Sequence, residues 1–442
     1  MNYRWSYFVV QYPISGKRVI LKNFLTSAVV VLTQKLLNTI NAWLKDNRII
    51  GVDNETQGIL LGDNGFLVEG QKDEYSEYMS SFLKTRNKHA QLFSLHFLPT
   101  MKCQLKCPYC FENGVRRMGT MSGETLSQSV NWIAHYLEVN PEVKSFRCVL
   151  FGGEPLLEKD LIREALSRIS SVVKSTGVQF WTDITTNGEL LEPSIASTLK
   201  EYGCRKVQIT LDGPKKMHDI RRRGLGKHPS FDRIISNVVM LLDGNFVERV
   251  NLRISLDKET ADFIPDLLKF LSKMRRKDRI QLSLGVVVPS LGTTTTEIHE
   301  RFVAQKAVDI WKIAQDLGFE IPEEFLLGPW CVAIAKHSAV LQPNGSLQKC
   351  FCTVGRPEYD FANVSTAPKS YSRDSRFEHF ERMNDCMKEK CPYLPICGGG
   401  CIHDSVVRYG LTGFSKRLCQ KELIKRINQG LILLKYKTLS EA

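Results

Sequence analysis

Three cysteines stand close together in the segment from 101 to 112, which reads MKCQLKCPYCFE. They are Cys103, Cys107 and Cys110, with the spacing C-x3-C-x2-C. Three thiolates suit a [4Fe-4S] cluster, because they hold three irons and leave the fourth open to a small molecule. The alternative is a structural zinc site with a remote fourth ligand, since Cys107-Pro-Tyr-Cys110 alone fits a zinc knuckle. The spacing favours the cluster, because no fourth ligand lies nearby.

Predicted strands and helices alternate through the middle of the chain. Apolar residues at helical spacing, such as Leu126, Val130 and Ile133, lie between strand-like runs. Six such units predict a parallel sheet with helices outside it, either an open sheet or an incomplete barrel. In both cases the site belongs at the C-terminal ends of the strands. The runs cover 93–99, 146–151, 178–184, 205–211, 249–256 and 279–288.

Two conspicuous segments follow the first two predicted strands. The first strand runs up to Thr100, so the three cysteines lie in the loop above its C-terminal end. The second strand ends in Phe151-Gly-Gly-Glu-Pro155. Because the C-terminal ends of parallel strands meet at one edge of the sheet, we expect the two segments to lie side by side.

Both segments resemble motifs of one known family. The cysteine loop, with Tyr109 before its last cysteine, is similar to the signature of radical S-adenosylmethionine (SAM) enzymes, and residues 152–155 resemble that family's GGEP motif. The resemblance implies a partial (βα)6 TIM barrel and a [4Fe-4S] cluster whose open iron is chelated by SAM. An electron from the cluster then cleaves SAM into methionine and a 5′-deoxyadenosyl radical. Gly152 and Gly153 are expected to let the backbone approach the methionine moiety, and Glu154 to orient the loop or accept from the amino group.

The next two strand ends supply further candidates for SAM binding. Thr186 and Asn187 follow the third strand, and Thr210 and Asp212 end the fourth. Hydroxyl and amide groups there suit ribose hydroxyls and the methionine carboxylate. The alternative is ordinary turn chemistry, because Asn-Gly and Asp-Gly commonly end strands. Arg222 is expected to pair with the cofactor carboxylate, since arginine favours bidentate geometry.

Eight more cysteines occupy the C-terminal third in a recognisable pattern. It resembles the SPASM extension of radical SAM enzymes, C-x(9–15)-G-x4-C, a gap, C-x2-C-x5-C-x3-C, another gap and C. The segment from Cys391 to Cys401 matches closely, whereas four residues separate Cys386 from Cys391 where the family usually has two. The departure concerns the local loop and not the number of ligands. The eight are Cys331, Cys350, Cys352, Cys386, Cys391, Cys397, Cys401 and Cys419.

The SPASM resemblance implies two auxiliary [4Fe-4S] clusters, and so three in all. Seven or more thiols exceed the needs of one tetrahedral zinc, although a zinc ribbon is the alternative. Cys148 and Cys204 are interpreted as buried residues outside these sites. One cluster would take Cys386, Cys391, Cys397 and Cys419. The other would take Cys331, Cys350 and Cys401, with Cys352 as the candidate fourth ligand or an open site for a substrate thiolate.

The first 92 residues contain no cysteine and need a separate interpretation. Apolar residues at helical spacing predict a helix over 33–44, followed by a strand at 65–69 and a helix over about 73–84. The segment resembles the winged-helix region with which peptide-modifying SPASM enzymes bind a leader peptide as an added strand. The alternative is a packing domain that caps the barrel bottom.

Composition limits the remaining classes. A chain of 442 residues with 43% hydrophobic content predicts two or three domains. A net charge of +13 suits an acidic partner, but no dense basic block favours nucleic acid. The N-terminus lacks a signal sequence and no apolar run spans a bilayer, so a cytoplasmic protein without a membrane partner is expected. In that reducing compartment the 13 cysteines are interpreted mainly as metal ligands.

Together these features predict an enzyme of three parts: a leader-binding region at 1–92, a radical SAM barrel at 93–320 and a SPASM domain at 321–442. The predicted substrate is a ribosomally made precursor peptide with a leader, and an electron donor such as flavodoxin or ferredoxin is expected. The product would be a thioether, a carbon–carbon crosslink, an epimer or a backbone excision. The alternatives are an anaerobic sulfatase-maturating enzyme that forms formylglycine and a non-catalytic zinc-binding module.

Overall fold

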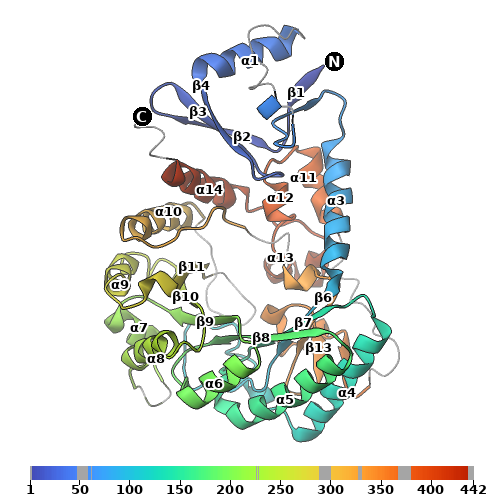
Figure 1. Cartoon of the computed structure of the whole chain (residues 1–442), viewed down its shortest axis with the longest axis vertical. Helices are drawn as coiled ribbons and strands as arrows, with labels where there is room; N and C mark the ends of the chain where they lie inside the picture. Colours follow the sequence, from blue (N-terminus) through green and yellow to red (C-terminus); the bar gives the residue numbers. More distant parts are fainter. Residues whose placement is uncertain are drawn as a thin grey trace.

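A computed structural model of the chain shows three regions (Figure 1). The N-terminal region lies at the top, a parallel sheet flanked by helices lies at the bottom, and the short helices of the C-terminal part lie between them. The structure describes residues 2–46, 58–60, 62–224, 226, 228–287, 300–326, 331–366 and 380–436.

Six parallel strands form the core of the largest sheet, and each pairs with the next strand along the chain. This confirms the six predicted strands, except that position 288 lies outside the described residues. The strands are β6 (Leu92–Phe97), β7 (Ser145–Leu150), β8 (Gln179–Thr186), β9 (Lys206–Leu211), β10 (Val250–Leu256) and β11 (Ile280–Val286).

Helices cover the outer face of this sheet, as expected for consecutive βα units. Along β7, Phe146, Cys148 and Leu150 are fully buried in the shared apolar core. The first helix begins after Ser122, whose hydroxyl accepts from the Thr125 N–H at 3.0 Å. The helices are α4 (Gly123–Val139), α5 (Lys159–Ser175), α6 (Pro193–Glu201), α7 (Lys215–Arg221), α8 (Phe231–Asp243), α9 (Ile264–Leu271) and α10 (Glu300–Asp316).

The C-terminal part shares the barrel's sheet. β12 (Ser338–Leu341) pairs in parallel with β6, and β13 (Ser346–Gln348) and β14 (Ala362–Asn363) continue the sheet in antiparallel fashion. Gly345 makes the turn between β12 and β13 at φ +81°, a conformation that favours glycine. The predicted boundary at 320 falls between α10 and β12, but the main chains on its two sides are hydrogen-bonded into one sheet.

Two of the C-terminal cysteines, Cys386 and Cys397, lie within short α-helices. Between them the chain makes turns, so tertiary contacts and not regular structure set their relative positions. The last helix packs along α10 of the barrel part. The helices are α11 (Asn384–Lys388), α12 (Leu394–Cys397), α13 (Ile402–Tyr409) and α14 (Lys421–Lys435).

The N-terminal region is built around a three-stranded antiparallel sheet in the order β2-β3-β4. The predicted helices and the strand near 65–69 are present, whereas the four strands that precede the first helix were not predicted. The elements are β1 (Tyr3–Trp5), β2 (Val9–Ile14), β3 (Arg18–Asn23), β4 (Val29–Thr33), α1 (Gln34–Asp46), β5 (Leu67–Glu69) and α3 (Glu74–Lys88).

This N-terminal region packs on the cysteine-rich part. The rings of Phe24 and Tyr393 lie 5.0 Å apart, and Lys22 forms an ion pair with Glu324 at 2.5 Å. The Arg86 side chain donates to the Ile334 carbonyl at 2.8 Å. These contacts place the sheet against the C-terminal part (Figure 1), rather than beneath the barrel as in the alternative considered above.

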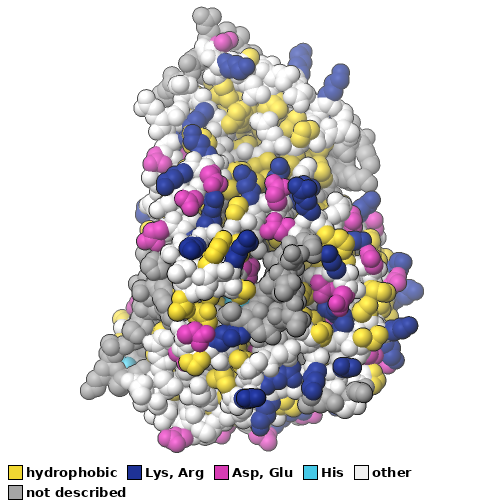
Figure 2. Space-filling view, turned by 180° about the vertical axis from the view of Figure 1, so that it is seen from behind, with side chains coloured by type: hydrophobic (Ala, Val, Ile, Leu, Met, Phe, Trp, Pro, Cys, Tyr) yellow, Lys and Arg dark blue, Asp and Glu magenta, His cyan; other side chains and the backbone are white. Residues whose placement is uncertain are grey.

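The surface of the molecule carries charges of both signs. Figure 2 shows Lys and Arg side chains scattered over one face, interspersed with acidic and apolar ones. Among the described residues no helix is both long and apolar enough to cross a bilayer.

Candidate active site

A cavity of about 450 Å³ opens at the C-terminal ends of the barrel strands. Cys103, Cys107 and Cys110 line it, so the loop after β6 delivers all three thiols to one space. Cys352 and His403 of the C-terminal part line it as well. The cavity therefore lies between the barrel and the cysteine-rich part.

The three loop thiols suit a positively charged metal centre. Burial raises the pKa of Cys103 and of Cys110 to about 12 each, and the neighbouring Cys107 adds to both shifts. Burial also raises the pKa of Cys107, a shift that Arg222 and Arg116 oppose. Because thiolates are the form that binds metal, a bound cation is what would stabilise three of them so close together. The donor set therefore fits an iron–sulfur cluster.

The loop after β7 is fixed to the cysteine loop. A Cβ atom built on Gly152 would lie 2.4 Å from the Thr100 carbonyl oxygen, and one on Gly153 would lie 2.3 Å from that of Lys102. Both glycines also line the cavity. They are needed first for the close packing of two loops, a role that the sequence did not indicate.

Glu154 holds the loop after β8 instead of facing the cavity. One carboxylate oxygen accepts from the Leu156 N–H at 3.0 Å and from the Thr186 hydroxyl at 2.7 Å, and the other accepts from the Asn187 N–H at 2.7 Å. Burial raises the pKa of Glu154 to about 6. Of the two roles expected for it, these contacts match the orienting one, while Thr186 and Asn187 themselves line the cavity.

Tyr109 connects the cysteine loop to the end of β9. Its hydroxyl donates to Asp212, with distances of 2.6 and 2.8 Å to the two carboxylate oxygens, and accepts from Arg222 at 2.7 Å. Arg222 and Thr210 line the cavity, whereas Asp212 is fully buried behind them. Six of the eight predicted SAM-binding residues thus line the cavity, whereas Glu154 and Asp212 do not line it and instead hold other residues of the site through hydrogen bonds.

The C-terminal thiols fall into two groups of four. The pKa of Cys352 is raised by its hydrogen bond with Cys350, by burial, and by the nearby Cys401 and Cys331. Within the other group, burial raises the pKa of Cys386, and Cys391 and Cys419 contribute. Cys397 is influenced in turn by Cys386 and Cys391 after burial. The SPASM resemblance assigns the same two sets to two clusters, and that assignment stays a prediction. Cys148 is buried in β7 and Cys204 follows α6.

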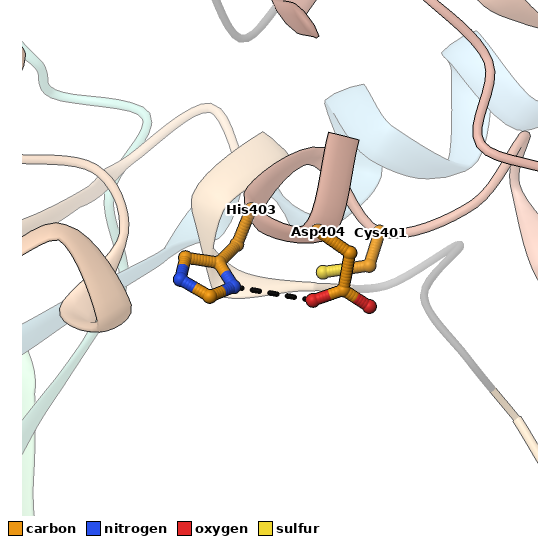
Figure 3. A group of neighbouring side chains, drawn as sticks. All are labelled: Cys401, His403 and Asp404. Atoms are coloured by element: carbon orange, nitrogen blue, oxygen red, sulfur yellow. Dashed lines mark hydrogen bonds and ion pairs between the residues drawn. The ribbon is translucent and has the colours of Figure 1, made fainter. Parts of the chain in front are cut away.

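A histidine that the sequence did not single out stands beside the first of these groups. Figure 3 shows Cys401, His403 and Asp404, whose ligand atoms lie within 4.8 Å of one another. His403 Nδ1 is 3.1 Å from an Asp404 carboxylate oxygen, while Nε2 is buried without a partner among the described residues. The sequence signal that could have identified His403 is its position two residues after the predicted ligand Cys401.

Charged side chains on the inner face of the barrel were also missed. Arg147, Asp183, Lys206 and Arg253 line the cavity from β7, β8, β9 and β10. Arg147 and Arg253 each stand between two buried apolar neighbours, so strand periodicity assigns them to the inner face. Barrel interiors are usually filled by branched apolar side chains, and charges at these positions therefore indicate a hollow site.

The radical SAM superfamily model matches residues 97–271, which include the three-cysteine loop, the glycine pair and the end of β9. The chain thus contains a radical SAM domain and is an enzyme of this class.

Three curated relatives extend the likeness over more of the chain. The radical SAM cyclopropyl synthase TigE of Paramaledivibacter caminithermalis is 20% identical over 83% of this chain and 80% of its own length. The subtilosin biosynthesis protein AlbA of Bacillus subtilis is 26% identical over 68% of this chain and 65% of its own. A cysteine-type anaerobic sulfatase-maturating enzyme of Clostridium perfringens is 27% identical over 68% and 85%.

A solved structure shares the fold across nearly the whole chain. Streptococcus suis SuiB bound to S-adenosylmethionine aligns with a TM-score of 0.54 and 16% identity, over 94% of this chain and 99% of SuiB. With that coverage, most of the N-terminal region has a counterpart there.

Proposed function

We propose that this radical SAM enzyme modifies a ribosomally made precursor peptide. The observation that carries the proposal is the cavity, which is bordered on one side by the three-cysteine loop and on the other by Cys352 and His403. A substrate held there lies between the site of radical generation and the cysteine-rich part. AlbA, named for the biosynthesis of the bacteriocin subtilosin, is a relative with a peptide product.

The roles of the barrel residues follow from their positions. Cys103, Cys107 and Cys110 would hold a [4Fe-4S] cluster, and the Tyr109–Asp212–Arg222 network would support the cofactor from the β9 side. Bound SAM, on reductive cleavage, supplies the radical that abstracts a hydrogen atom from the substrate. The chain's own contribution is to orient the cofactor and to exclude water and oxygen from a cavity closed by two parts of the protein.

Two auxiliary clusters are part of this proposal. The two groups of four thiols each match the ligand number of a closed [4Fe-4S] cluster. The grouping supports Cys352 as the fourth ligand beside Cys331, Cys350 and Cys401, because its thiol interacts with all three. A cluster there would lie next to the cavity and accept an electron from the modified peptide or pass one to the barrel.

The N-terminal sheet offers an edge for a leader peptide. The Asn23 N–H donates to the Ala28 carbonyl at 3.0 Å and the Gln34 N–H to that of Lys17 at 2.6 Å, which fixes the alternation of hydrogen bonds between β3 and β4. By this alternation Val29, Val31 and Thr33 direct their main-chain groups away from β3. In the pairing of the described strands β4 has no second partner, so a peptide strand can be added there.

The sulfatase-maturating alternative has the Clostridium perfringens relative in its favour. Formylglycine formation needs no leader-binding region, so this alternative does not explain an N-terminal sheet with an open edge. The zinc-module alternative leaves the SAM-type cavity without a role.

The proposed function is tested by anaerobic reconstitution with iron and sulfide, followed by incubation with SAM, a reductant and each short peptide encoded beside this gene. High-resolution mass spectrometry in deuterated and ordinary water detects loss of hydrogen, excision or epimerisation. Modification of a neighbouring peptide is the expected result. Modification of a sulfatase-derived cysteine or serine peptide alone would support the alternative, and zinc without iron in the purified protein would contradict both enzymes.

A further inference from the structure

The cavity carries an excess of positive charge that the cofactor site does not fully explain. Most of its basic side chains have an assigned negative neighbour. Arg147 pairs with Asp183 at 2.6 Å, and Arg116 and Arg222 lie near the thiol of Cys107. The charged lining residues are Arg116, Arg147, Lys206, Arg222 and Arg253 on the basic side and Glu112 and Asp183 on the acidic side.

Arg253 differs from Arg147 and Arg222, which form ion pairs with Asp183 and Asp212. Within the described part of the chain its guanidinium has neither an ion pair nor a hydrogen bond to a carboxylate. Burial lowers its pKa, against the influence of Tyr109 and Asp212. Its side chain is only partly buried and lines the cavity, so a positive charge without a paired carboxylate there indicates an anion that arrives with a ligand.

The neighbouring strand is shaped to accommodate this side chain. A Cβ atom built on Gly285 would lie 2.0 Å from Cζ of Arg253 and 2.2 Å from one of its terminal nitrogens. The guanidinium therefore lies against Gly285 of β11, where a side chain would displace it. The pairing partners of Arg253 are Thr210 on β9 and Ser283 on β11, which places it at the level of the predicted cofactor residue Thr210.

Arg253 shares the cavity with residues of the C-terminal part. Besides Tyr109 and Asp212, the thiol of Cys352 is among the groups that influence it electrostatically. Arg253, Cys352 and the three loop cysteines line the same cavity, which is where the substrate is expected.

We propose that Arg253 anchors a carboxylate-binding subsite that receives an Asp or Glu side chain, or the free C-terminus, of the peptide substrate. Resting on the proposed function, this assigns an acidic residue to the peptide near the position of hydrogen abstraction. Arginine suits the task, because its planar fork binds a carboxylate through two parallel hydrogen bonds. The carboxylate of SAM is the other possible source of the anion, and the experiment separates the two.

The test uses the anaerobically reconstituted enzyme without reductant, so that nothing turns over. The probes are SAM and two tripeptides, N-acetyl-alanyl-glutamyl-alanine amide and its glutaminyl counterpart, with dissociation constants measured calorimetrically in the presence of saturating SAM. The wild type is expected to bind the glutamyl peptide roughly tenfold more tightly. Arg253→Gln should abolish that preference and leave the affinity for SAM unchanged, while Arg253→Lys should retain part of it.

Two further variants test the geometry. Gly285→Ala should reduce the glutamyl preference without removing any charge, because its Cβ displaces the guanidinium. Arg249→Gln, which removes an exposed ion pair with Glu320 just before the same strand, should change neither affinity and is the matched control. Iron content and the thermal midpoint confirm that each variant is folded.

Two results would overturn the subsite. One is equal affinity of the wild type for the two tripeptides, or no binding of either. The other is a loss of SAM affinity in Arg253→Gln with the glutamyl preference intact, which would assign the arginine to the cofactor. Failure of the proposed function is distinguishable, since it is an absence of hydrogen abstraction from every peptide even where the glutamyl preference is measured.

Discussion

The two cysteine-rich regions of this molecule are built in opposite ways. In the barrel, the three thiols fall within a stretch of eight residues after one strand. The loop that holds them packs against Gly152 and Gly153, and Glu154 fixes the next loop by hydrogen bonds. In the C-terminal part, eight thiols come from segments spread between 331 and 419, and several belong to the apolar core itself. The barrel thiols are therefore held by loops of a region whose core is packed without them. The C-terminal thiols are themselves part of the core of their region. We expect metal removal to affect chemistry in the barrel and stability in the C-terminal part.

The largest effect is expected from replacing Cys103, Cys107 and Cys110 together by Ala. Iron should fall by about a third from roughly 12 per chain, and all reductive cleavage of SAM should cease. The barrel should remain folded, because its apolar core lies on the other side of the sheet. Iron analysis, SAM cleavage and the thermal midpoint measure the three quantities. Unchanged iron would contradict the assignment of this loop.

Cys397→Ala should have the reverse profile. Cys397 is 9% exposed and belongs to the core of the C-terminal part, so the loss of its cluster should lower the thermal midpoint as well as the yield of modified peptide. Cleavage of SAM without peptide should persist, since that cofactor binds in the barrel. Cys204→Ala, at a half-buried position outside both groups, is the control. If the Cys397 variant formed as much product as the wild type, the auxiliary cluster that Cys397 is proposed to bind would not be needed for the reaction.

Val31→Pro tests whether a leader peptide binds to the open edge of β4 in the N-terminal sheet. The substitution removes a main-chain donor that points away from β3 and leaves the β3–β4 ladder intact. Peptide affinity should fall roughly tenfold, with SAM cleavage unchanged. Val31→Ala keeps the N–H and controls for lost packing. Deleting residues 1 to 90 is a less specific test, because Phe24 and Tyr78 pack into the cysteine-rich core. Equal peptide affinity in the proline and alanine variants would place leader binding elsewhere.

The smallest effect concerns pH and the barrel's own stability. Burial lowers the pKa of His218 to about 3, with a further contribution from Arg222 and an opposing one from Asp212. The folded state therefore binds fewer protons than the unfolded state between about pH 6.5 and pH 3, and stability is lost as the pH falls through this range. At about pH 5.5 the loss is about 1 kcal/mol.

His218→Asn retains an acceptor for the Asp212 N–H, which lies 3.4 Å from Nδ1, and removes the titration. Its thermal midpoint should therefore fall less between about pH 7 and about pH 5.5 than that of the wild type. Parallel falls in the two proteins would show that another group, such as a C-terminal ligand, controls the acid sensitivity.

The barrel could be predicted from the sequence because its signals are local. Each strand and helix has its own period, and the rule for strand ends places the cysteine loop and residues 152–155 together. The strands of the N-terminal sheet were missed for the converse reason. They are short, Pro13 interrupts β2, and their stability comes from pairing and from packing against distant elements.

The wall of the cavity shows a second limit. The alternation around Arg147 and Arg253 assigns both to the inner face of a sheet, but periodicity does not say whether that face is packed or hollow. That depends on how far the barrel closes and on what lies over its end. Here the wall is completed by residues more than ninety positions beyond β10, namely Phe351, Cys352 and His403.

The pairing of β12 with β6 ties the folding of the barrel to a segment made late in synthesis. Until residues 338–341 leave the ribosome, β6 has a partner only on its β7 side, and its other edge exposes unpaired main-chain groups. A chain shortened at about residue 320 would keep every loop ligand and yet present this edge to other molecules. Such a fragment should associate in solution through this edge. The barrel and the C-terminal part therefore have to be expressed and engineered as one unit.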